Sequence, residues 1–313
     1  MMNLKDLFMI KQSIKRKYIF LGEIDSINIE IIVKSFNKLK DKISYVIICN
    51  KLDFLKNNFF KKNRLKINEI YDPINFRNYK KNNLNIFDIS HISKKKYLNL
   101  INQIKVANSL AKITGYDLVT MPINKTVFKK KIKFTGMTEY LGKINDRSTI
   151  MLMHGDKFSI IPLTTHINLK KVYKSINSKN ITFLLNVIFN NIDKNLYNLK
   201  FNHIKFLCHN PHCGEGGTLG KEDILLRKML KKFKKIEALY PADSVFNKIE
   251  KKTLFLSTYH DQALIPFKIL NKKSINLTLG LNYRRISPAH GTAKDIKNKF
   301  IADNTSYLTC LLF

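Results

Sequence analysis

The stretch KYIFLGEIDSINIEIIVKSFNKLKDKISYVIICN, residues 17–50, determines the fold class that the sequence predicts. Lys17–Leu21 and Ile43–Cys49 are short apolar runs of the kind that form buried strands. Each run is followed by a segment with the apolar periodicity of a helix. Strands that alternate with helices in this way predict an α/β fold with a partly parallel sheet.

The same alternation continues beyond residue 50. Leu65–Ile70 is a weaker candidate strand, and Asp117–Met121 has the composition of a buried strand. A helix is expected between them over residues 97–115, and Gly115 is its C-terminal stop. The apolar face of that helix is formed by Leu100, Ile104, Ala107 and Ala111.

The middle of the chain predicts a hairpin followed by further strands and helices. Thr149–Met153 and Ser159–Leu163 are short strands separated by HGDK, which has the composition of a hairpin turn. Two lobes that share one sheet are expected, because no internal repeat or long linker is visible. The other expected elements are helices near residues 170–191 and 222–235 and strands at residues 204–209 and 253–258.

Composition indicates a folded protein that works inside the cell. Hydrophobic residues make up 44% of the 313 residues, which excludes a disordered chain. No apolar run reaches the roughly 18 residues of a membrane-spanning helix, and the N-terminus lacks a secretory signal. The four cysteines include no C-x-x-C pair, and a chain of this length needs no disulfide framework. We expect a soluble, cytoplasmic protein in which Cys213 is a small loop residue rather than a reactive thiol.

The net charge of +33 has two explanations. Such a charge can indicate a nucleic-acid binder, whose basic residues cluster on one element. Here the lysines are spread along the chain, and Lys, Ile, Asn, Phe and Tyr share AT-rich codons, so a biased genome explains them better. Nucleic acid is therefore not the expected partner, although the positive surface should attract anionic substrates and cofactors.

The segment NPHCGEGGTLGKED, residues 210–223, is the most distinctive in the chain. Its glycines allow the backbone to approach a ligand closely, and a helix that begins near Lys221 could direct N–H groups at an anion. A dinucleotide fingerprint is excluded, because its third glycine would fall on Leu219. The alternative is an ordinary glycine-rich turn. The four glycines are Gly214, Gly216, Gly217 and Gly220.

Three histidines each follow a predicted strand. They are His166 in TTH, His212 in NPH and His260 in YHDQ. Because the carboxyl ends of strands collect at one edge of an α/β sheet, these imidazoles are expected to lie near one another. Three neutral imidazoles suit Zn, Mn, Co or Ni and leave positions open for a substrate oxygen. A single histidine is more often an ordinary core or surface residue, so spacing alone does not prove the site.

Other polar residues are candidates for binding a substrate or cofactor. Lys268 and Arg285 suit phosphate and carboxylate groups, although a lone lysine carries little weight among 56 basic residues. Asp243 in PADSVF is either a helix N-cap or a site residue. The segment HGTAKD, residues 290–295, either binds an adenosine or caps a helix.

Taken together, these segments resemble the 4-hydroxythreonine-4-phosphate dehydrogenase family of vitamin B6 synthesis. NPH-x-GEGG and YHDQ-x-L-x-P-x-K are highly specific in combination and occur in the family's order. The matching segments are GEIDSINIEIIVKS (22–35), DLVTMPINK (117–125), FTGMTEYLG (134–142), TTHINL (164–169), NPHCGEGGTLGKED (210–223), YPADSVF (240–246), YHDQALIPFK (259–268) and NLTLGLNYRRISPAHGTAKDI (276–296).

The resemblance implies a two-lobed α/β fold like that of isocitrate and isopropylmalate dehydrogenases. This fold differs from the Rossmann fold. The active site would lie in the cleft between the lobes. Residues 1–130 and 286–313 would form the first lobe. Residues 131–285 would form the second, with the metal site and the dimer interface. A homodimer with active sites shared between subunits is implied.

The resemblance also assigns roles to residues. It implies NAD or NADP as cofactor, a divalent metal (Zn, Mg, Mn or Co), and oxidation of the phosphorylated hydroxy acid to a β-keto acid that loses CO2. We expect Asp243 to handle a proton. The implied metal ligands are His166, His212 and His260; the substrate ligands are Thr138, Lys268, Asn276 and Arg285, with Lys268 also catalytic; and the cofactor contacts are Gly214, Gly216, His290, Gly291 and Asp295.

Several positions depart from the family pattern. Met137 stands where the family has a histidine before the threonine, and methionine cannot donate a hydrogen bond to a substrate anion. Ala289 replaces an aspartate before His290, and Lys297 and Asn298 replace an Ala-Gly pair near the cofactor. These departures leave two alternatives: a dehydrogenase of another phosphorylated sugar acid (phosphothreonate or phosphoerythronate), or a decayed, non-catalytic homologue.

Overall fold

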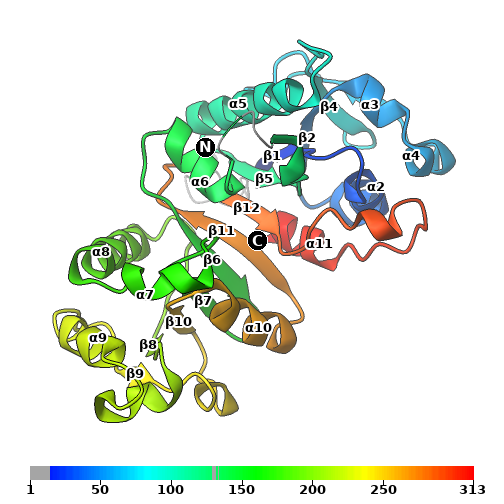
Figure 1. Cartoon of the computed structure of the whole chain (residues 1–313). Coiled ribbons are helices and arrows are strands. Elements are labelled where there is room, and N and C mark those ends of the chain that lie inside the picture. The colour runs from blue at the N-terminus through cyan, green and yellow to red at the C-terminus, as the bar shows by residue number, and fades with distance from the viewer. Residues whose placement is uncertain (1–14, 129–131, 133) are drawn as a thin grey trace, which may run out of the picture. The chain divides into compact units, whose positions relative to one another are not determined.

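The computed structural model of the chain describes residues 15–128, 132 and 134–313 (Figure 1). The chain divides into two compact units. Unit 1 consists of Met1–Phe128 and Arg285–Phe313, and unit 2 consists of Lys129–Arg284. Both units combine strands with helices, which confirms the α/β class predicted from the sequence.

Unit 1 contains a parallel sheet with the strand order β3-β4-β2-β1-β5-β12. The central strands are almost entirely buried, as expected for parallel strands that are covered on both faces. The strands are β1 (Arg16–Phe20), β2 (Ser44–Cys49), β3 (Ile67–Glu69), β4 (Leu84–Asp88), β5 (Asp117–Thr120) and β12 (Arg285–Pro288).

The longest helix of unit 1 is α5, Lys96–Thr114. It ends where Gly115 adopts a left-handed φ of 71° and closes the last turn, as the sequence predicted. All four residues of its predicted apolar face are buried. The other helices are α2 (Asn28–Leu39), α3 (Lys51–Leu55), α4 (Asn58–Asn63) and α11 (Thr305–Leu312), with 3-10 turns η1 (Lys125–Phe128) and η5 (Lys294–Ile296).

Unit 2 contains strands in the order β11-β6-β7-β10-β8-β9. Strand β6 is antiparallel to both of its neighbours, so β6 and β7 form the predicted hairpin. Strands β7, β10, β8 and β9 are parallel to one another. The strands are β6 (Ile150–Gly155), β7 (Ser159–Pro162), β8 (His203–Leu207), β9 (Leu239–Tyr240), β10 (Thr253–Ser257) and β11 (Ser274–Leu279).

The helices of unit 2 differ from the sequence prediction in two places. The helix expected at 170–191 is divided, because Ile176 leaves helical geometry and the Asn177 side chain caps a new helix by accepting from the Asn180 N–H. The helix expected at 222–235 already ends at Leu230. The helices are α6 (Met137–Ile144), α7 (Val172–Ser175), α8 (Ser178–Lys194), α9 (Glu222–Leu230) and α10 (His260–Leu270), with 3-10 turns η2 (Leu169–Lys171), η3 (Pro211–Gly217) and η4 (Val245–Asn247).

Two further observations concern the predictions made from composition. Among the described residues, no helix is long and apolar enough to span a membrane. Cys208 and Cys213 are joined as a disulfide, contrary to the expectation of a chain without disulfides. The reason is local, because the loop after β8 turns back on itself and brings the two Cα atoms to 5.0 Å, a distance that a disulfide can span.

Candidate functional site

The three candidate metal ligands follow three strands that are neighbours in unit 2. His166, His260 and His212 come after β7, β10 and β8, respectively. These strands are adjacent and parallel in the order β7-β10-β8, so their carboxyl ends lie at the same edge of the sheet. Strand topology therefore places the three loops side by side, as the strand-end argument predicted.

His166 contacts a carboxylate that the sequence prediction did not include. Its Nδ1 atom lies 3.5 Å from Oε1 of Glu139 in α6, and that oxygen also accepts a 3.0 Å hydrogen bond from Thr165. Burial opposes ionisation of Glu139, but its contacts with His166 and Thr165 outweigh this effect and lower its pKa to about 2. Glu139 is therefore ionised beside the His166 ring.

The other two candidate ligands also have a carboxylate beside Nδ1. His260 begins α10, and its Nδ1 lies 2.6 Å from Oδ1 of Asp261. In His212 the Nδ1 atom lies 4.0 Å from Oδ2 of Asp243. Metal-bound histidines commonly direct one ring nitrogen at a carboxylate, which orients the ring and makes the other nitrogen a better ligand. Imidazoles with a carboxylate beside them are donors that a divalent metal ion accepts, so the chemistry of these three residues fits such a group.

The structure brings two of the three imidazoles close together. The ring centroids of His166 and His260 are 5.9 Å apart. Within residues 15–128, 132 and 134–313, however, no three His, Cys, Asp or Glu side chains lie close enough to share one ion. Joint metal binding by His166, His212 and His260 therefore stays a prediction.

The loop that carries His212 has an unusual backbone. His212, Cys213 and Glu215 have positive φ angles of 47°, 56° and 43°, in the left-handed region that non-glycine residues seldom adopt. Gly214 and Gly216 share this conformation at no steric cost. The sequence indicated a glycine-rich loop whose backbone can approach a ligand closely, but gave no sign that the residues between the glycines would also be left-handed.

Asp223, in the first turn of α9, binds two backbone N–H groups next to the loop that was predicted to bind an anion. Its two carboxylate oxygens accept hydrogen bonds from the backbone N–H groups of His209 (2.6 Å) and Asn210 (2.9 Å). The Asp223 side chain is fully buried, so these contacts fix the start of the NPH segment. A cofactor role for Gly214 and Gly216 stays a prediction.

Gln262 joins the ends of the two strands that precede His212 and His260. Its Nε2 donates a 2.6 Å hydrogen bond to the backbone carbonyl of Cys208, directly after β8. Its Oε1 accepts from the backbone N–H (3.1 Å) and the hydroxyl (3.2 Å) of Thr258, directly after β10. The YHDQ motif contains this residue, but the pairing depends on tertiary structure and could not be inferred from spacing.

Of the predicted substrate ligands in unit 2, Asn276 lies on strand β11 and Thr138 contacts that strand. Thr138 is buried, and its hydroxyl lies 3.1 Å from that of Thr278. Asn276 precedes Thr278 by two residues, which places both on one face of the strand. Among the described residues, the side-chain oxygen of Asn276 is buried without a hydrogen-bond partner. A buried acceptor of this kind is suited to a ligand that donates a hydrogen bond.

The other two predicted substrate ligands differ in environment. Lys268 is exposed on α10 in unit 2. Arg285 belongs to β12 of unit 1, where it is 4% exposed and its Nε and Nη2 atoms donate to the hydroxyl of Thr120 at 2.9 and 2.6 Å. Thr120 ends β5, so it holds the guanidinium at the carboxyl edge of the unit 1 sheet.

The predicted cofactor segment forms a loop in unit 1. The Nδ1 atom of His290 lies 2.8 Å from the Gly291 carbonyl oxygen, and burial lowers the His290 pKa. Gly291 and Asp295 are exposed. Within the part of the chain that is described, the buried His290 Nε2 has no hydrogen-bond partner, which leaves it available to a ligand.

Two lysines of this loop are held by a single carboxylate. Asp25, in the loop after β1, pairs with Lys297 at 2.5 Å and with Lys294 at 3.0 Å. The hydrogen bond from Lys297 has the largest effect on the Asp25 pKa, and the one from Lys294 the next largest; together they lower this pKa to about 2. Lys297 is one of the departures from the family pattern, and its ammonium group is paired with Asp25.

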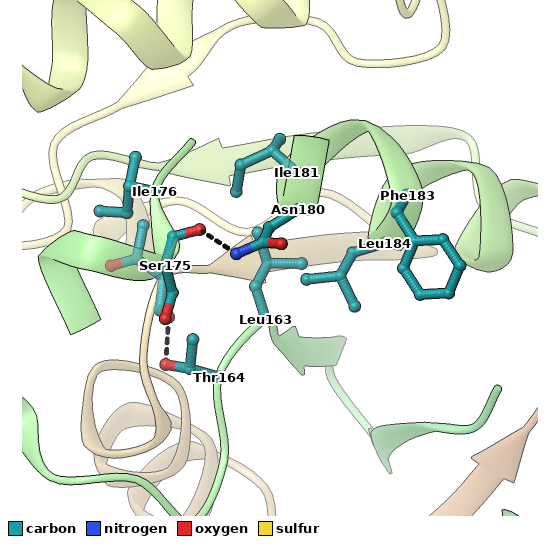
Figure 2. Close-up of a pocket in the computed structure, with 9 residues that line it drawn as sticks. Leu163, Thr164, Ser175, Ile176, Asn180, Ile181, Phe183 and Leu184 are labelled. Carbon is teal, nitrogen blue, oxygen red and sulfur yellow. Dashed lines mark hydrogen bonds between the residues drawn. The ribbon is translucent and has the colours of Figure 1, made fainter. Parts of the chain in front are cut away.

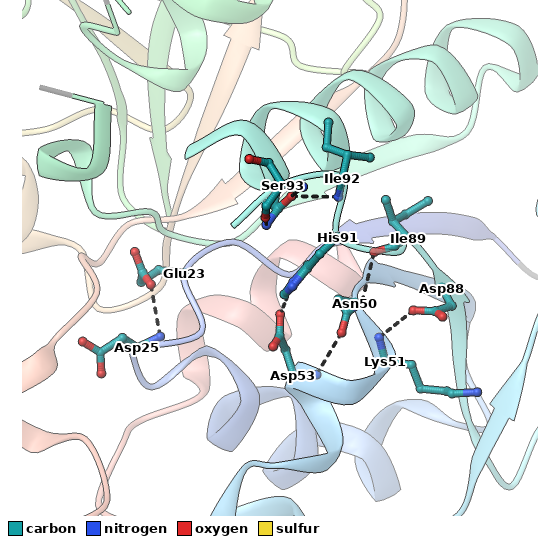
Figure 3. A network of polar contacts seen from close by, with 11 residues as sticks. Glu23, Asp25, Asn50, Lys51, Asp53, Asp88, Ile89, His91, Ile92 and Ser93 are labelled. Carbon is teal, nitrogen blue, oxygen red and sulfur yellow. Dashed lines mark hydrogen bonds and ion pairs between the residues drawn. The ribbon is translucent and has the colours of Figure 1, made fainter. Parts of the chain in front are cut away.

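A cavity of about 120 Å³ in unit 1 is lined in part by Glu23, Asn50, Asp53 and His91, whose polar contacts are drawn in Figure 3. His91 Nε2 lies 2.6 Å from Oδ2 of Asp53, and the Asp53 backbone N–H donates to the Asn50 side chain at 3.1 Å. These groups follow β1, β2 and β4, so the cavity occupies the carboxyl edge of the parallel strands, where α/β proteins bind ligands.

A second cavity, of about 230 Å³, lies near the His166 loop in unit 2 (Figure 2). It is lined mainly by apolar side chains such as Leu163, Ile181 and Leu184. Thr164, at its margin, donates its hydroxyl to the Thr258 carbonyl at 2.7 Å. Burial of a phosphate among apolar groups is costly, so this cavity does not suit a phosphorylated substrate.

Comparison with known proteins identifies the family. The family model for the pyridoxal phosphate biosynthetic protein PdxA matches residues 41–313. The chain belongs to the PdxA family. It is 33% identical to the 4-hydroxythreonine-4-phosphate dehydrogenase of Aquifex aeolicus (strain VF5) over 312 residues, which cover 95% of this chain and 96% of that protein. It is 39% identical to the Hydrogenobaculum sp. (strain Y04AAS1) protein of the same name over 200 residues, or 62% of this chain and 64% of that protein.

Solved structures support the same assignment at the level of the fold. A 4-hydroxythreonine-4-phosphate dehydrogenase from Klebsiella pneumoniae superposes on this PdxA family chain with a TM-score of 0.78 and 24% identity. The superposition covers 95% of this chain and 97% of the other. The two-unit α/β architecture is thus the fold of PdxA family proteins.

Proposed function

We propose that this chain oxidises 4-phosphooxy-L-threonine with NAD to 2-amino-3-oxo-4-phosphooxybutanoate, which loses CO2 to give 3-amino-2-oxopropyl phosphate for pyridoxal 5'-phosphate synthesis. The observation that carries the proposal is the arrangement of His166, His212 and His260. They follow three adjacent parallel strands, and each has a carboxylate beside Nδ1. Such histidines are suited to hold a divalent metal ion such as Zn, Mg, Mn or Co.

The bound metal would supply a Lewis acid that polarises the substrate hydroxyl and lowers its pKa. Asp243 is our candidate for the group that takes the hydroxyl proton. Its Oδ2 lies 4.0 Å from His212 and its side chain is 61% exposed, so a proton accepted there can pass on to water. NAD, when bound, would supply the acceptor for the hydride of the same carbon, so oxidation of the alcohol would be balanced by reduction of the cofactor.

Binding and orientation fall to cationic and polar side chains. Lys268 and Arg285 would hold the substrate's phosphate and carboxylate, Arg285 with its planar guanidinium. Asn276 offers its buried oxygen to the substrate's amino group, which donates hydrogen bonds. Thr138 can donate its hydroxyl to a phosphate oxygen. These contacts explain why substrates that lack the phosphate should react poorly.

The cofactor would lie against the HGTAKD loop. His290 contributes its unpaired Nε2, and Gly291 and Asp295 are exposed where an adenosine can approach. Gly214 and Gly216 would contribute close backbone contacts, because neither carries a side chain to exclude a ligand. NADP in place of NAD is the alternative.

A homodimer is part of the proposal. Helix α10 exposes Ile265 (60%) and Ile269 (74%) one turn apart on the same face, and they line a cavity of about 510 Å³ with Phe246. Covering this apolar face with a second chain would bring that chain close to His260, at the start of the helix. Sedimentation should show a dimer that Ile269→Glu dissociates, whereas Ile113→Glu, at a 68% exposed position on α5, should leave it intact.

The test of the function is the product of the reaction. The purified chain, supplied with a divalent metal, NAD and 4-phosphooxy-L-threonine, should form NADH, CO2 and 3-amino-2-oxopropyl phosphate in equal amounts. A chain that binds no metal and reduces no NAD with any phosphorylated hydroxy acid would instead be a non-catalytic homologue. We expect a cytoplasmic enzyme.

A sister activity on phosphothreonate or phosphoerythronate is the second candidate. Met137 favours it, because this residue begins α6 directly before Thr138 and carries a thioether that cannot donate to an anion. Steady-state NADH formation should be compared with both substrate classes. If kcat/KM is higher with a phosphorylated sugar acid than with 4-phosphooxy-L-threonine, the sugar acid becomes the assigned substrate.

A further inference from the structure

The Cys208–Cys213 disulfide lies in the same loop as His212. Cys208 directly follows β8 and is 1% exposed, whereas Cys213 is only partly buried. The other two cysteines, Cys49 and Cys310, are buried and free. One cysteine pair is therefore already bonded, and one of its two residues, Cys213, is partly exposed to solvent.

The crosslink connects a fixed point of the fold to the loop that presents His212. Cys208 is held on both sides, because its N–H donates to the Tyr240 carbonyl at 2.8 Å and its carbonyl accepts from Gln262 at 2.6 Å. Cys213 belongs to the left-handed run that also includes His212. Breaking the bond would therefore leave Cys208 in place and release the His212 end of the loop.

We propose that Cys208 and Cys213 form a thiol–disulfide exchange site, at which small-molecule thiols and their disulfides control the position of His212. In the oxidising direction, the Cys213 thiolate attacks a disulfide such as glutathione disulfide, forms a mixed disulfide and displaces one thiol. Cys208 then attacks Cys213, and the second small thiol leaves. Two protein thiols are oxidised and one small disulfide is reduced to two thiols, so electrons and atoms balance.

The dithiol is the working form of the enzyme. Thiols of cytoplasmic proteins are kept reduced, and a disulfide that forms there is usually catalytic or redox-sensing. With the bond open, His212 and Cys213 are free to leave the left-handed conformation, and His212 can adjust to the metal. With the bond closed, His212 is confined. This consequence for turnover rests on the proposed dehydrogenase function; the exchange chemistry itself does not.

The test uses the full-length wild-type chain, equilibrated with either glutathione disulfide or dithiothreitol and then alkylated. Mass analysis of the tryptic peptide 206–221 reads both cysteines. After oxidation it should carry two fewer alkyl groups, and hydrogen exchange at residues 209–219 should slow. Turnover of the oxidised protein should fall by about tenfold to a hundredfold and recover with dithiothreitol, because small misplacements at an active site cost that much.

Two variants control for other effects of the oxidant. Cys213→Ala cannot form the bond, so its turnover should not respond to glutathione disulfide. Cys49→Ala retains the pair, so oxidation should still inhibit it. Complete alkylation of both cysteines after oxidation would overturn the proposal, and so would equal turnover and equal hydrogen exchange in the two forms. If no form turns over substrate while the bond forms and exchange slows, the dehydrogenase assignment fails and the exchange site stands.

Discussion

The Nε2 atom of Gln262 donates a 2.6 Å hydrogen bond to the backbone carbonyl of Cys208. Its other amide atom accepts from Thr258, so this one side chain joins the end of β8 to the end of β10. His212 and His260 follow these two strand ends. The relative position of two proposed metal ligands therefore depends on the Gln262 side chain.

Replacing Gln262 by Glu should separate the two strand ends. A carboxylate cannot donate to the Cys208 carbonyl, and the group left unsatisfied should cost about 1–3 kcal/mol of unfolding free energy. We expect weaker metal binding as well. The control is Asn82→Asp, the same change from amide to acid at an exposed position. Equal urea midpoints and equal metal affinity for Gln262→Glu and wild type would contradict this role.

Glu139→Gln should weaken metal binding without unfolding the protein. Loss of the carboxylate beside Nδ1 leaves the His166 ring less well oriented, and such changes cost about 10- to 100-fold in metal affinity. The chain offers a matched control, since Glu237 pairs with His203 and both pairs have side-chain exposures of 36% and 34%. Titration with Co²⁺ should show unchanged affinity in Glu237→Gln. Equal affinities in both variants would exclude an orienting role for Glu139.

Lys17→Met should destabilise unit 1 strongly. The Lys17 ammonium is fully buried, 2.9 Å from the Asp117 carboxylate and 3.2 Å from the Cys310 carbonyl. Removing one partner of a buried ion pair costs about 3–5 kcal/mol. Lys81→Met removes the partner of Asp41 in a pair whose side chains are 62% and 60% exposed, and should change stability far less, because water screens exposed charges. Urea denaturation compares the two, and similar losses would be inconsistent with this difference in burial.

Asp25→Asn should lower stability in a pH-dependent way. The Asp25 pKa of about 2 lies below its usual value of about 3.9, so its contribution is present above about pH 4 and is lost as the pH falls toward 2. Half of the side chain is exposed, so solvent screening limits the effect at neutral pH to about 1 kcal/mol or less. Urea denaturation from about pH 6 to about pH 2.5 should show the difference between wild type and variant shrinking. A constant difference would contradict the ion-pair explanation.

Much of the fold could be predicted because its signals are local. The apolar runs of β1 and β2 and the stop of α5 at Gly115 follow from composition and glycine chemistry. The placement of His166, His212 and His260 after parallel strands follows from the same periodicity. Their roles, however, came from the family resemblance.

What the sequence did not reveal depends on tertiary structure. Glu139 precedes His166 by 27 positions, and only the folded chain brings the two together. A five-residue separation does not predict the pairing of Cys208 with Cys213, because it requires a loop in which non-glycine residues are left-handed. The Gln262 contacts likewise join segments 54 positions apart.

Metal-dependent dehydrogenase activity is tested most directly by NADH formation from 4-phosphooxy-L-threonine, with metal content measured on the same samples. Wild type should turn over with metal bound. His166→Ala, His212→Ala and His260→Ala should each lose both metal and turnover while remaining folded, and His203→Ala should retain both. Full activity in His212→Ala, or a wild-type chain that reduces no NAD with this substrate, would contradict a dehydrogenase that depends on a metal held by these histidines.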